Sequence, residues 1–169
     1  MTTAEVLLQD FDIEMANTRR TLERVPDSKD KAEYKPHEKS FTMGKLAVHV
    51  ATLPKFGTTI LTTPGLDMAA TKWPENIFAS REKLLADFDA CAAEARAALV
   101  AAADPDLATS WKLSFGDKVI VDSPRSLAFR HMFFSHMIHH RAQLGVYLRL
   151  NDVPVPGVYG PSADEPFVP

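Results

Sequence analysis

Apolar residues recur at alternating steps of three and four along several long segments of this chain, which is the pattern of amphipathic helices. The first stripe consists of Ala4, Leu8, Phe11, Met15, Thr18, Leu22 and Val25, and the helix is expected to end near Pro26. The second stripe, within residues 40–63, consists of Met43, Leu46, Val50, Leu53, Phe56 and Ile60. Residues 27–39 between the two are rich in Lys, Asp and Glu, so we expect a solvated connection there.

Pro54 lies inside the second predicted helix. It lacks an amide hydrogen and crowds the carbonyl group of Val50, so we expect a kink just after His49. Such a kink would re-aim the histidine or open the core. The alternative, a tolerated proline without a function, stays open.

A third helix is predicted by its start signal. Ser80 is placed to be the N-cap, with Glu82 in the first turn, and Asp104-Pro105-Asp106 is expected to end the helix. Its inner face is predicted to carry Phe78, Leu85, Phe88, Ala92, Ala95 and Leu99.

Between Thr109 and Asp122 the pattern changes from helical to alternating. Trp111, Leu113 and Phe115 fall on one side, and Val119 and Val121 follow a Gly116-Asp117 turn. A short β-hairpin fits this spacing better than a helix does.

A fourth helix is predicted from Ser123, as N-cap, and Pro124, as the first helical residue, to about Leu150, with Asn151 ending it. The proline-rich tail that follows is apolar, and we expect it to pack back along the helices. These elements predict an all-α fold, an antiparallel four-helix bundle with a short β-hairpin before the last helix and a Pro-rich C-terminal tail, in a single domain over residues 1–169.

Composition narrows the function classes. The chain has 169 residues, 46% hydrophobic and 24% charged, and its uncharged apolar runs are shorter than the roughly 20 residues that span a bilayer. No basic and apolar leader is visible at the start, so a cytoplasmic location is expected and a membrane partner is not. The net charge of −3, with scattered Lys and Arg, argues against nucleic acid as a partner.

The single cysteine, Cys91, excludes an intramolecular disulfide. Its alanine neighbours indicate a small buried side chain within a helix. A role as nucleophile is the weaker interpretation, because no histidine lies near it in the sequence.

The candidate chemistry lies in three histidines. His136 and His140 are four residues apart on the fourth predicted helix, so both imidazoles project from one face, about one turn apart. His49 interrupts the apolar stripe of the second helix in the same way. An unpaired buried imidazole would cost roughly 1–3 kcal/mol, and one ion explains three such interruptions more simply than three separate hydrogen-bonding arrangements. We therefore predict a three-histidine metal site with open coordination positions, suited to zinc or nickel.

For other polar and aromatic residues, the sequence gives weaker support for a role at the metal site. His139 is interpreted as a surface or outer-shell residue, and His131 and His37 lie off the ligand face and in a polar loop, respectively. Gln143 and Arg141 are candidate outer-shell donors or substrate contacts, with a solvated helix flank slightly favoured for Arg141. For Tyr147 ordinary packing is at least as good an interpretation as a pocket role, and Trp73 and Trp111 are expected to be core or loop anchors.

The chain resembles the DinB-like (DinB/YfiT) family of metal-binding four-helix bundles. The resemblance rests on the segments Leu46-Ala47-Val48-His49-Val50-Ala51, His136-Met137-Ile138-His139-His140-Arg141-Ala142-Gln143-Leu144 and Tyr159-Gly160-Pro161-Ser162-Ala163-Asp164-Glu165. It implies a divalent metal, often zinc or nickel, a homodimer, and relatives that act as transferases or isomerases with low-molecular-weight thiols. The family name derives from induction by DNA damage, whereas this acidic chain carries no nucleic-acid-binding signature.

Three hypotheses follow. The leading one is a metal-dependent enzyme, a thiol-dependent transferase or a hydrolase, in which the ion activates a bound water or thiol and polarises a small-molecule substrate. The second is a non-catalytic metal-binding, stress-associated protein. The third is a structural bundle with core histidines and no metal. The sequence identifies no catalytic residue beyond the three ligands.

Overall fold

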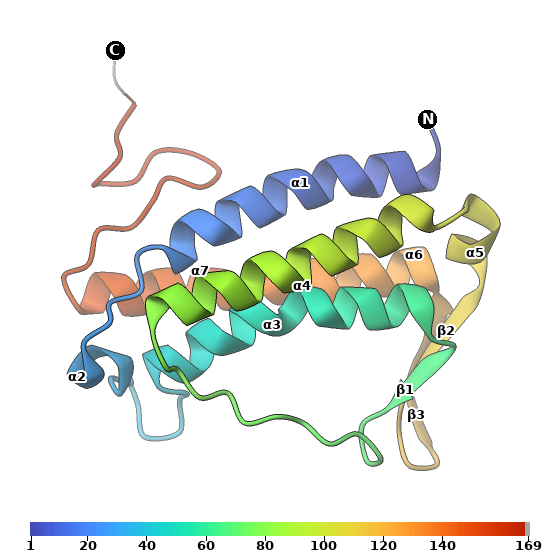
Figure 1. Cartoon of the computed structure of the whole chain (residues 1–169), viewed down its shortest axis with the longest axis horizontal. Helices are drawn as coiled ribbons and strands as arrows, with labels where there is room; N and C mark the ends of the chain where they lie inside the picture. Colours follow the sequence, from blue (N-terminus) through green and yellow to red (C-terminus); the bar gives the residue numbers. More distant parts are fainter. Residues whose placement is uncertain (168–169) are drawn as a thin grey trace.

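The long helices of this protein surround one core and carry a small sheet at one end (Figure 1). The computed structural model describes residues 1–167. The fold is mostly helical, with α1 (Thr3–Leu22), α2 (Lys29–Ala32), α3 (Met43–Thr62), α4 (Arg81–Ala101), α5 (Asp104–Ala108), α6 (Arg125–Ala128), the π-helix η1 (Phe129–Ser135) and α7 (His136–Leu150). The strands are β1 (Gly65–Asp67), β2 (Ser110–Phe115) and β3 (Lys118–Pro124).

Side-chain caps fix where the first three long helices begin. Thr2 and Glu5 form a capping box at α1, in which the Thr2 hydroxyl accepts from the Glu5 amide and the Glu5 carboxylate accepts from the Thr2 amide. Thr42 caps α3 by accepting from the Lys45 amide. Ser80 caps α4 by accepting from the Lys83 amide, which confirms the predicted start of the third helix.

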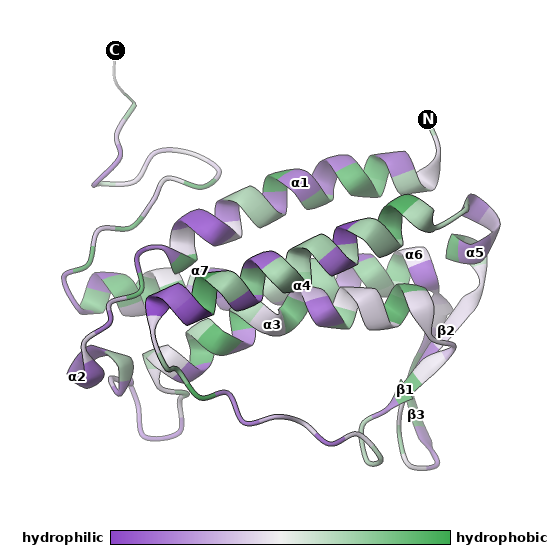
Figure 2. Ribbon diagram, in the orientation of Figure 1, coloured by the Kyte–Doolittle hydropathy of each residue, from purple (hydrophilic) through white to green (hydrophobic). Residues whose placement is uncertain are grey.

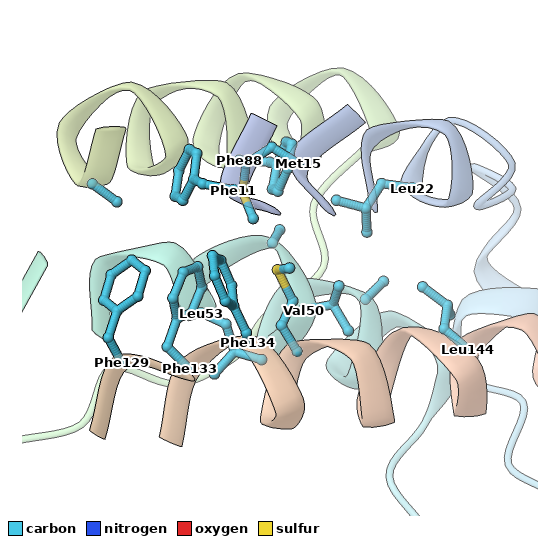
Figure 3. Packing of buried hydrophobic residues seen from close by; sticks show 14 of the residues in the cluster. Phe11, Met15, Leu22, Val50, Leu53, Phe88, Phe129, Phe133, Phe134 and Leu144 are labelled. Atoms are coloured by element: carbon cyan, nitrogen blue, oxygen red, sulfur yellow. The ribbon is translucent and has the colours of Figure 1, made fainter. Parts of the chain in front are cut away.

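The long helices bury their apolar stripes against one another. Helix α4 packs against α1 and α3, and α7 packs against α3 and α1. Hydrophobic and hydrophilic residues alternate along the long helices (Figure 2), and the buried positions are mostly hydrophobic. In the core, Phe133 and Phe134 lie with their ring centroids 6.2 Å from that of Phe11 (Figure 3).

The last helical run is continuous from Arg125 to Leu150, but its second part, η1, is a π-helix. A π-turn holds more residues than an α-turn. As a result Phe129, Phe133 and Phe134 are all buried on one side of η1. The helix that leads into the histidine pair is therefore not the uniform α-helix that the sequence pattern predicted.

The predicted start of this run at Ser123 is wrong. Ser123 lies in β3, where it pairs with Trp111 of β2, and Pro124 stands at the N-cap without a side-chain hydrogen bond. Ser123 belongs to the strand and not to the helix because hydrogen bonds of Arg125 fix the point at which β3 ends and the helix begins. Its amide donates to the Thr109 carbonyl, and its guanidinium donates to the backbone of Ile60, at the C-terminal end of α3.

The predicted hairpin is present, with a third strand beside it. β2 and β3 pair in antiparallel register across Gly116, whose φ of +56° suits glycine. β1 pairs with β2 in parallel and was not predicted, because three residues are too few to show an alternating pattern. Gly65 is needed there, since an added Cβ would lie 2.6 Å from the Lys112 carbonyl oxygen.

Three boundaries also differ from prediction. The first helix ends at Leu22 and not near Pro26, and residues 27–39 contain the short helix α2. The third predicted helix, α4, ends at Ala101, before Asp104. Asp104 begins the short helix α5, and its carboxylate accepts from the Thr3 and Ala4 amides at the start of α1.

Residues 153–167 form neither helix nor strand, and ion pairs link them to two helices. Glu165 pairs with Arg20 of α1 at 2.5 Å and with Arg24, just after the end of α1, at 2.7 Å. Asp164 pairs with Arg149 of α7 at 2.5 Å. None of the helices within residues 1–167 combines the length and the apolar character that a bilayer crossing requires.

Candidate metal centre

His49 of α3 and the pair His136 and His140 of α7 meet in one cluster. One ring nitrogen from each lies within 4.8 Å of the others. The Nε2 atoms of His49 and His136 are 3.4 Å apart, and the ring centroid of His140 lies 4.6 Å from that of His49 and 4.7 Å from that of His136. All three side chains are half-buried, so the cluster is reachable from solvent.

The cluster forms because α3 runs antiparallel to the continuous helical run of η1 and α7, in close contact with both. At one end of the contact, the Tyr147 hydroxyl donates to the Phe41 carbonyl group. At the other end Gly57 lies under the rings of Phe129 and Phe133, where an added Cβ would be 2.9 Å from Phe133 Cδ1. The missing side chain lets the two backbones approach closely enough for the histidines in between to meet.

Burial keeps these imidazoles neutral. Desolvation lowers the pKa of His49 to about 4, and the neighbouring His140 and His136 add to the effect. Desolvation also lowers the pKa of His136, with His140 contributing and a backbone hydrogen bond at Met132 opposing it. At neutral pH the cluster therefore offers nitrogen lone pairs.

Gln143 sets the orientation of one ring. Its Oε1 lies 2.8 Å from His140 Nδ1. Because an amide oxygen only accepts, this contact places the hydrogen on Nδ1 and leaves the Nε2 lone pair of His140 free. Desolvation lowers the pKa of His140, and this hydrogen bond opposes the shift. The predicted outer-shell position of Gln143 is thus present in the geometry.

The other candidate residues lie outside the cluster. His139 is exposed, with its ring 4.9 Å from that of His140, and His131 and His37 are exposed elsewhere. The hydroxyl of Tyr147 is engaged with the backbone, as the packing interpretation expected. Cys91 is half-buried, and burial raises the pKa of its thiol, which disfavours a nucleophilic role.

Two predictions about single residues are wrong. Arg141 is not on a solvated flank but only 3% exposed, because Glu14 and Thr18 of α1 bind its guanidinium. In the sequence, the polar residue Thr18 on the first apolar stripe indicated that a polar side chain from elsewhere is buried beside it; that side chain is Arg141. Trp73 anchors nothing in a core and is 56% exposed, whereas Trp111 is fully buried as predicted.

The spacing of one donor pair matches that of two ligands on a divalent ion, and the third donor lies within 4.8 Å of both. Nitrogen ligands at about 2.0–2.1 Å from a tetrahedral ion lie roughly 3.4 Å apart. The distance between His49 Nε2 and His136 Nε2 is 3.4 Å. Neutral imidazoles are donors that divalent transition metals accept, so the three histidines are a candidate metal site.

Fold and cluster together define a mostly helical protein with a three-histidine candidate metal site. The chain belongs to the DinB family, whose sequence model matches residues 1–166. It is similar to the crystal structure of a DinB-like protein from Bacillus cereus ATCC 10987, with 25% identity, coverage of 92% of this chain and 97% of that chain, and a TM-score of 0.67.

A DinB-like protein from Bacillus subtilis shares the fold at 21% identity, with coverage of 87% of this chain and 94% of that chain and a TM-score of 0.64. No curated protein matches the chain. The predicted family is confirmed.

Proposed function

We propose that this DinB-family protein binds one divalent ion, zinc or nickel, through His49, His136 and His140, and that it acts as a metal-dependent enzyme on a small molecule. The observation that carries the proposal is the convergence of the three ring nitrogens within 4.8 Å of one another. In the same proposal, the long helices form an antiparallel four-helix bundle with a Pro-rich tail, as one domain over residues 1–169.

The ligand set favours catalysis over a closed structural site. Structural zinc sites use four protein ligands, whereas here three histidines leave a position for water or substrate. When bound, the ion would lower the pKa of a water or thiol ligand and polarise an electrophile, which suits thiol transfer or hydrolysis. The half-buried rings leave that position accessible, and Gln143 holds the His140 ring in place.

The proposed partners follow from the same chemistry. The substrate is a small molecule, with a low-molecular-weight thiol as the co-substrate, and a second copy of the chain forms a homodimer. The acidic net charge of −3 disfavours nucleic acid, and we propose a cytoplasmic protein without a membrane partner.

A second candidate function rests on where the ligands come from. Because His49 is on α3 while His136 and His140 are on α7, a bound ion would tie two helices together. A non-catalytic, stress-associated metal-binding protein is the alternative that this favours. It expects a large loss of thermal stability on chelation and no turnover with thiols and electrophiles.

Elemental analysis of protein purified without an affinity tag is the first experiment. We expect about one zinc or nickel ion per chain in the wild type, and loss of that ion in His140→Ala. His139→Ala is the matched control, because it removes the adjacent exposed imidazole, which lies outside the cluster. Turnover with added metal and small thiols should then be lost in His140→Ala alone.

Two results would contradict the proposal. A wild type without metal, even after incubation with zinc or nickel, would leave a structural protein whose core histidines bond to one another. Turnover that is unchanged in His140→Ala would exclude an ion at this cluster from the reaction.

A further inference from the structure

Lys45 and Phe41 form a rim beside the histidine cluster. The ammonium of Lys45 lies over the Phe41 ring, 4.8 Å from its centroid. The Phe41 ring in turn meets the His49 ring edge-on, with 6.2 Å between centroids. Both rim residues are exposed, so a cation and an apolar ring stand together at the solvent side of the cluster.

The position of Lys45 on α3 relates it to the histidine cluster. Lys45 precedes His49 by one helical turn, so both side chains project from the same face of α3. Phe41 lies near Tyr147 and His49 lies against His136 and His140. Along the chain, Lys45 lies between Phe41, whose carbonyl group accepts from Tyr147, and His49, whose ring meets the α7 histidines.

The rim adds positive charge to a centre that has no carboxylate. Among residues 1–167, the groups that converge on the centre are three imidazoles, without Asp or Glu. A divalent ion on three neutral ligands keeps its full charge of +2. Lys45 forms no ion pair with the described residues, and its contact with Phe41 connects it to the ring that meets His49.

We propose that Lys45 and Phe41 select ligands that carry a carboxylate or a similar anionic group a few bonds from the atom that occupies the open coordination position. The Lys45 ammonium pairs with that anion, and the Phe41 ring holds the ammonium through a cation–π contact and packs on the apolar part of the ligand. The inference rests on the proposed function and specifies its co-substrate as an anionic thiol.

The test uses protein loaded with cobalt(II), because a thiolate that binds cobalt produces a charge-transfer absorption band that reports binding without turnover. Three thiols with similar short chains are titrated, the anionic 3-mercaptopropionate, the neutral 2-mercaptoethanol and the cationic cysteamine. Each thiol is compared between variants, so that its own acidity cancels.

We expect Lys45→Gln to weaken the binding of 3-mercaptopropionate by about threefold to fivefold, to leave 2-mercaptoethanol unchanged and to improve cysteamine binding. Lys45→Arg should keep the preference for the anion. Added salt should weaken the anionic thiol in the wild type and much less in Lys45→Gln. Lys55→Gln is the matched control, because Lys55 is an exposed lysine on the same helix that does not contact the rim.

The outcomes separate the two claims. If Lys45→Gln changes no thiol affinity, or changes all three equally, the rim does not select anions, while the metal centre stands. If the wild type binds no cobalt, the proposed metal site fails, and the inference fails with it.

Discussion

The guanidinium of Arg141 lies 2.7 Å from the carboxylate of Glu14, and the two side chains are only 4% and 12% exposed. The pair joins α7 to α1, and its α7 member, Arg141, directly follows His140 in the sequence. Thr18 and Tyr159 complete it, since the Thr18 hydroxyl accepts from Arg141 at 3.0 Å and the Tyr159 hydroxyl donates to the Glu14 carboxylate at 2.7 Å. Every partner of the buried charge is thus supplied within the fold.

Glu14→Ala should therefore destabilise the protein by about 3 kcal/mol, because it leaves the Arg141 charge buried without its counter-ion. Urea unfolding at neutral pH measures the change. Asp12→Ala is the matched control on the same helix. Its ion pair with Arg96 at 2.8 Å has side chains about half exposed, so we expect a loss of at most about 1 kcal/mol. Equal losses in the two variants would show that burial of the Arg141 pair has no energetic weight.

The helices and the histidine cluster were predictable because both depend on local spacing. A stripe such as Leu46, Val50 and Leu53 determines which face of α3 is buried, and His49 lies at the edge of that face. His136 and His140 share a face through their spacing alone. Two imidazoles on one helix and a third on an apolar stripe were enough to indicate the site.

Features that depend on distant partners were not predictable. Arg141 resembles a surface residue until Glu14, 127 positions earlier, is placed beside it. β1 exists only because β2 offers it a pairing edge. The π-helix η1 uses residues that also fit an α-helix, and the burial of Phe133 and Phe134 together becomes visible only when the core around Phe11 is assembled.

A second prediction concerns Gly57, where α3 approaches η1 closely. Gly57→Ala should destabilise the protein by about 1–3 kcal/mol, because the new Cβ would lie 2.9 Å from Phe133 Cδ1 and 3.1 Å from Phe129 Cε2. Gly145→Ala in α7 is the control, since its Cβ would meet only Val155 Cγ1, at 3.8 Å. That variant should gain up to about 1 kcal/mol from helix propensity. Thermal unfolding distinguishes them, and a stabilising Gly57→Ala would argue against the close packing.

The lowered pKa of His49 makes the stability of the metal-free protein depend on pH. An unfolded histidine takes up its proton near the ordinary pKa of 6.5, whereas folded His49 does so only near a pKa of about 4. Between these values the unfolded chain binds more protons, so acidification favours unfolding. The stability that His49 contributes is complete above pH 6.5 and is lost as the pH falls toward 4.

For His49 this loss amounts to at most about 3 kcal/mol, reduced by the partial exposure of the ring. Urea unfolding in the presence of a chelator, at about pH 7 and about pH 4.5, measures it. Carboxylates also titrate in this range, so the informative quantity is the difference between the wild type and His49→Gln. The variant should lose less stability on acidification, and an identical loss would mean that His49 is not desolvated.

The hydrogen bond between Gln143 and His140 predicts a change in metal affinity. Gln143→Leu removes the acceptor that keeps the hydrogen on Nδ1, so the Nε2 lone pair of His140 is no longer held toward the cluster, and zinc affinity should fall by about 10-fold to 100-fold. Gln143→Glu keeps an acceptor at the same place and should retain the affinity. Competition with a chromophoric zinc chelator measures both variants. His139→Ala removes an exposed neighbour and should bind zinc as the wild type does, whereas a Gln143→Leu protein with unchanged affinity would show that the ring needs no such support.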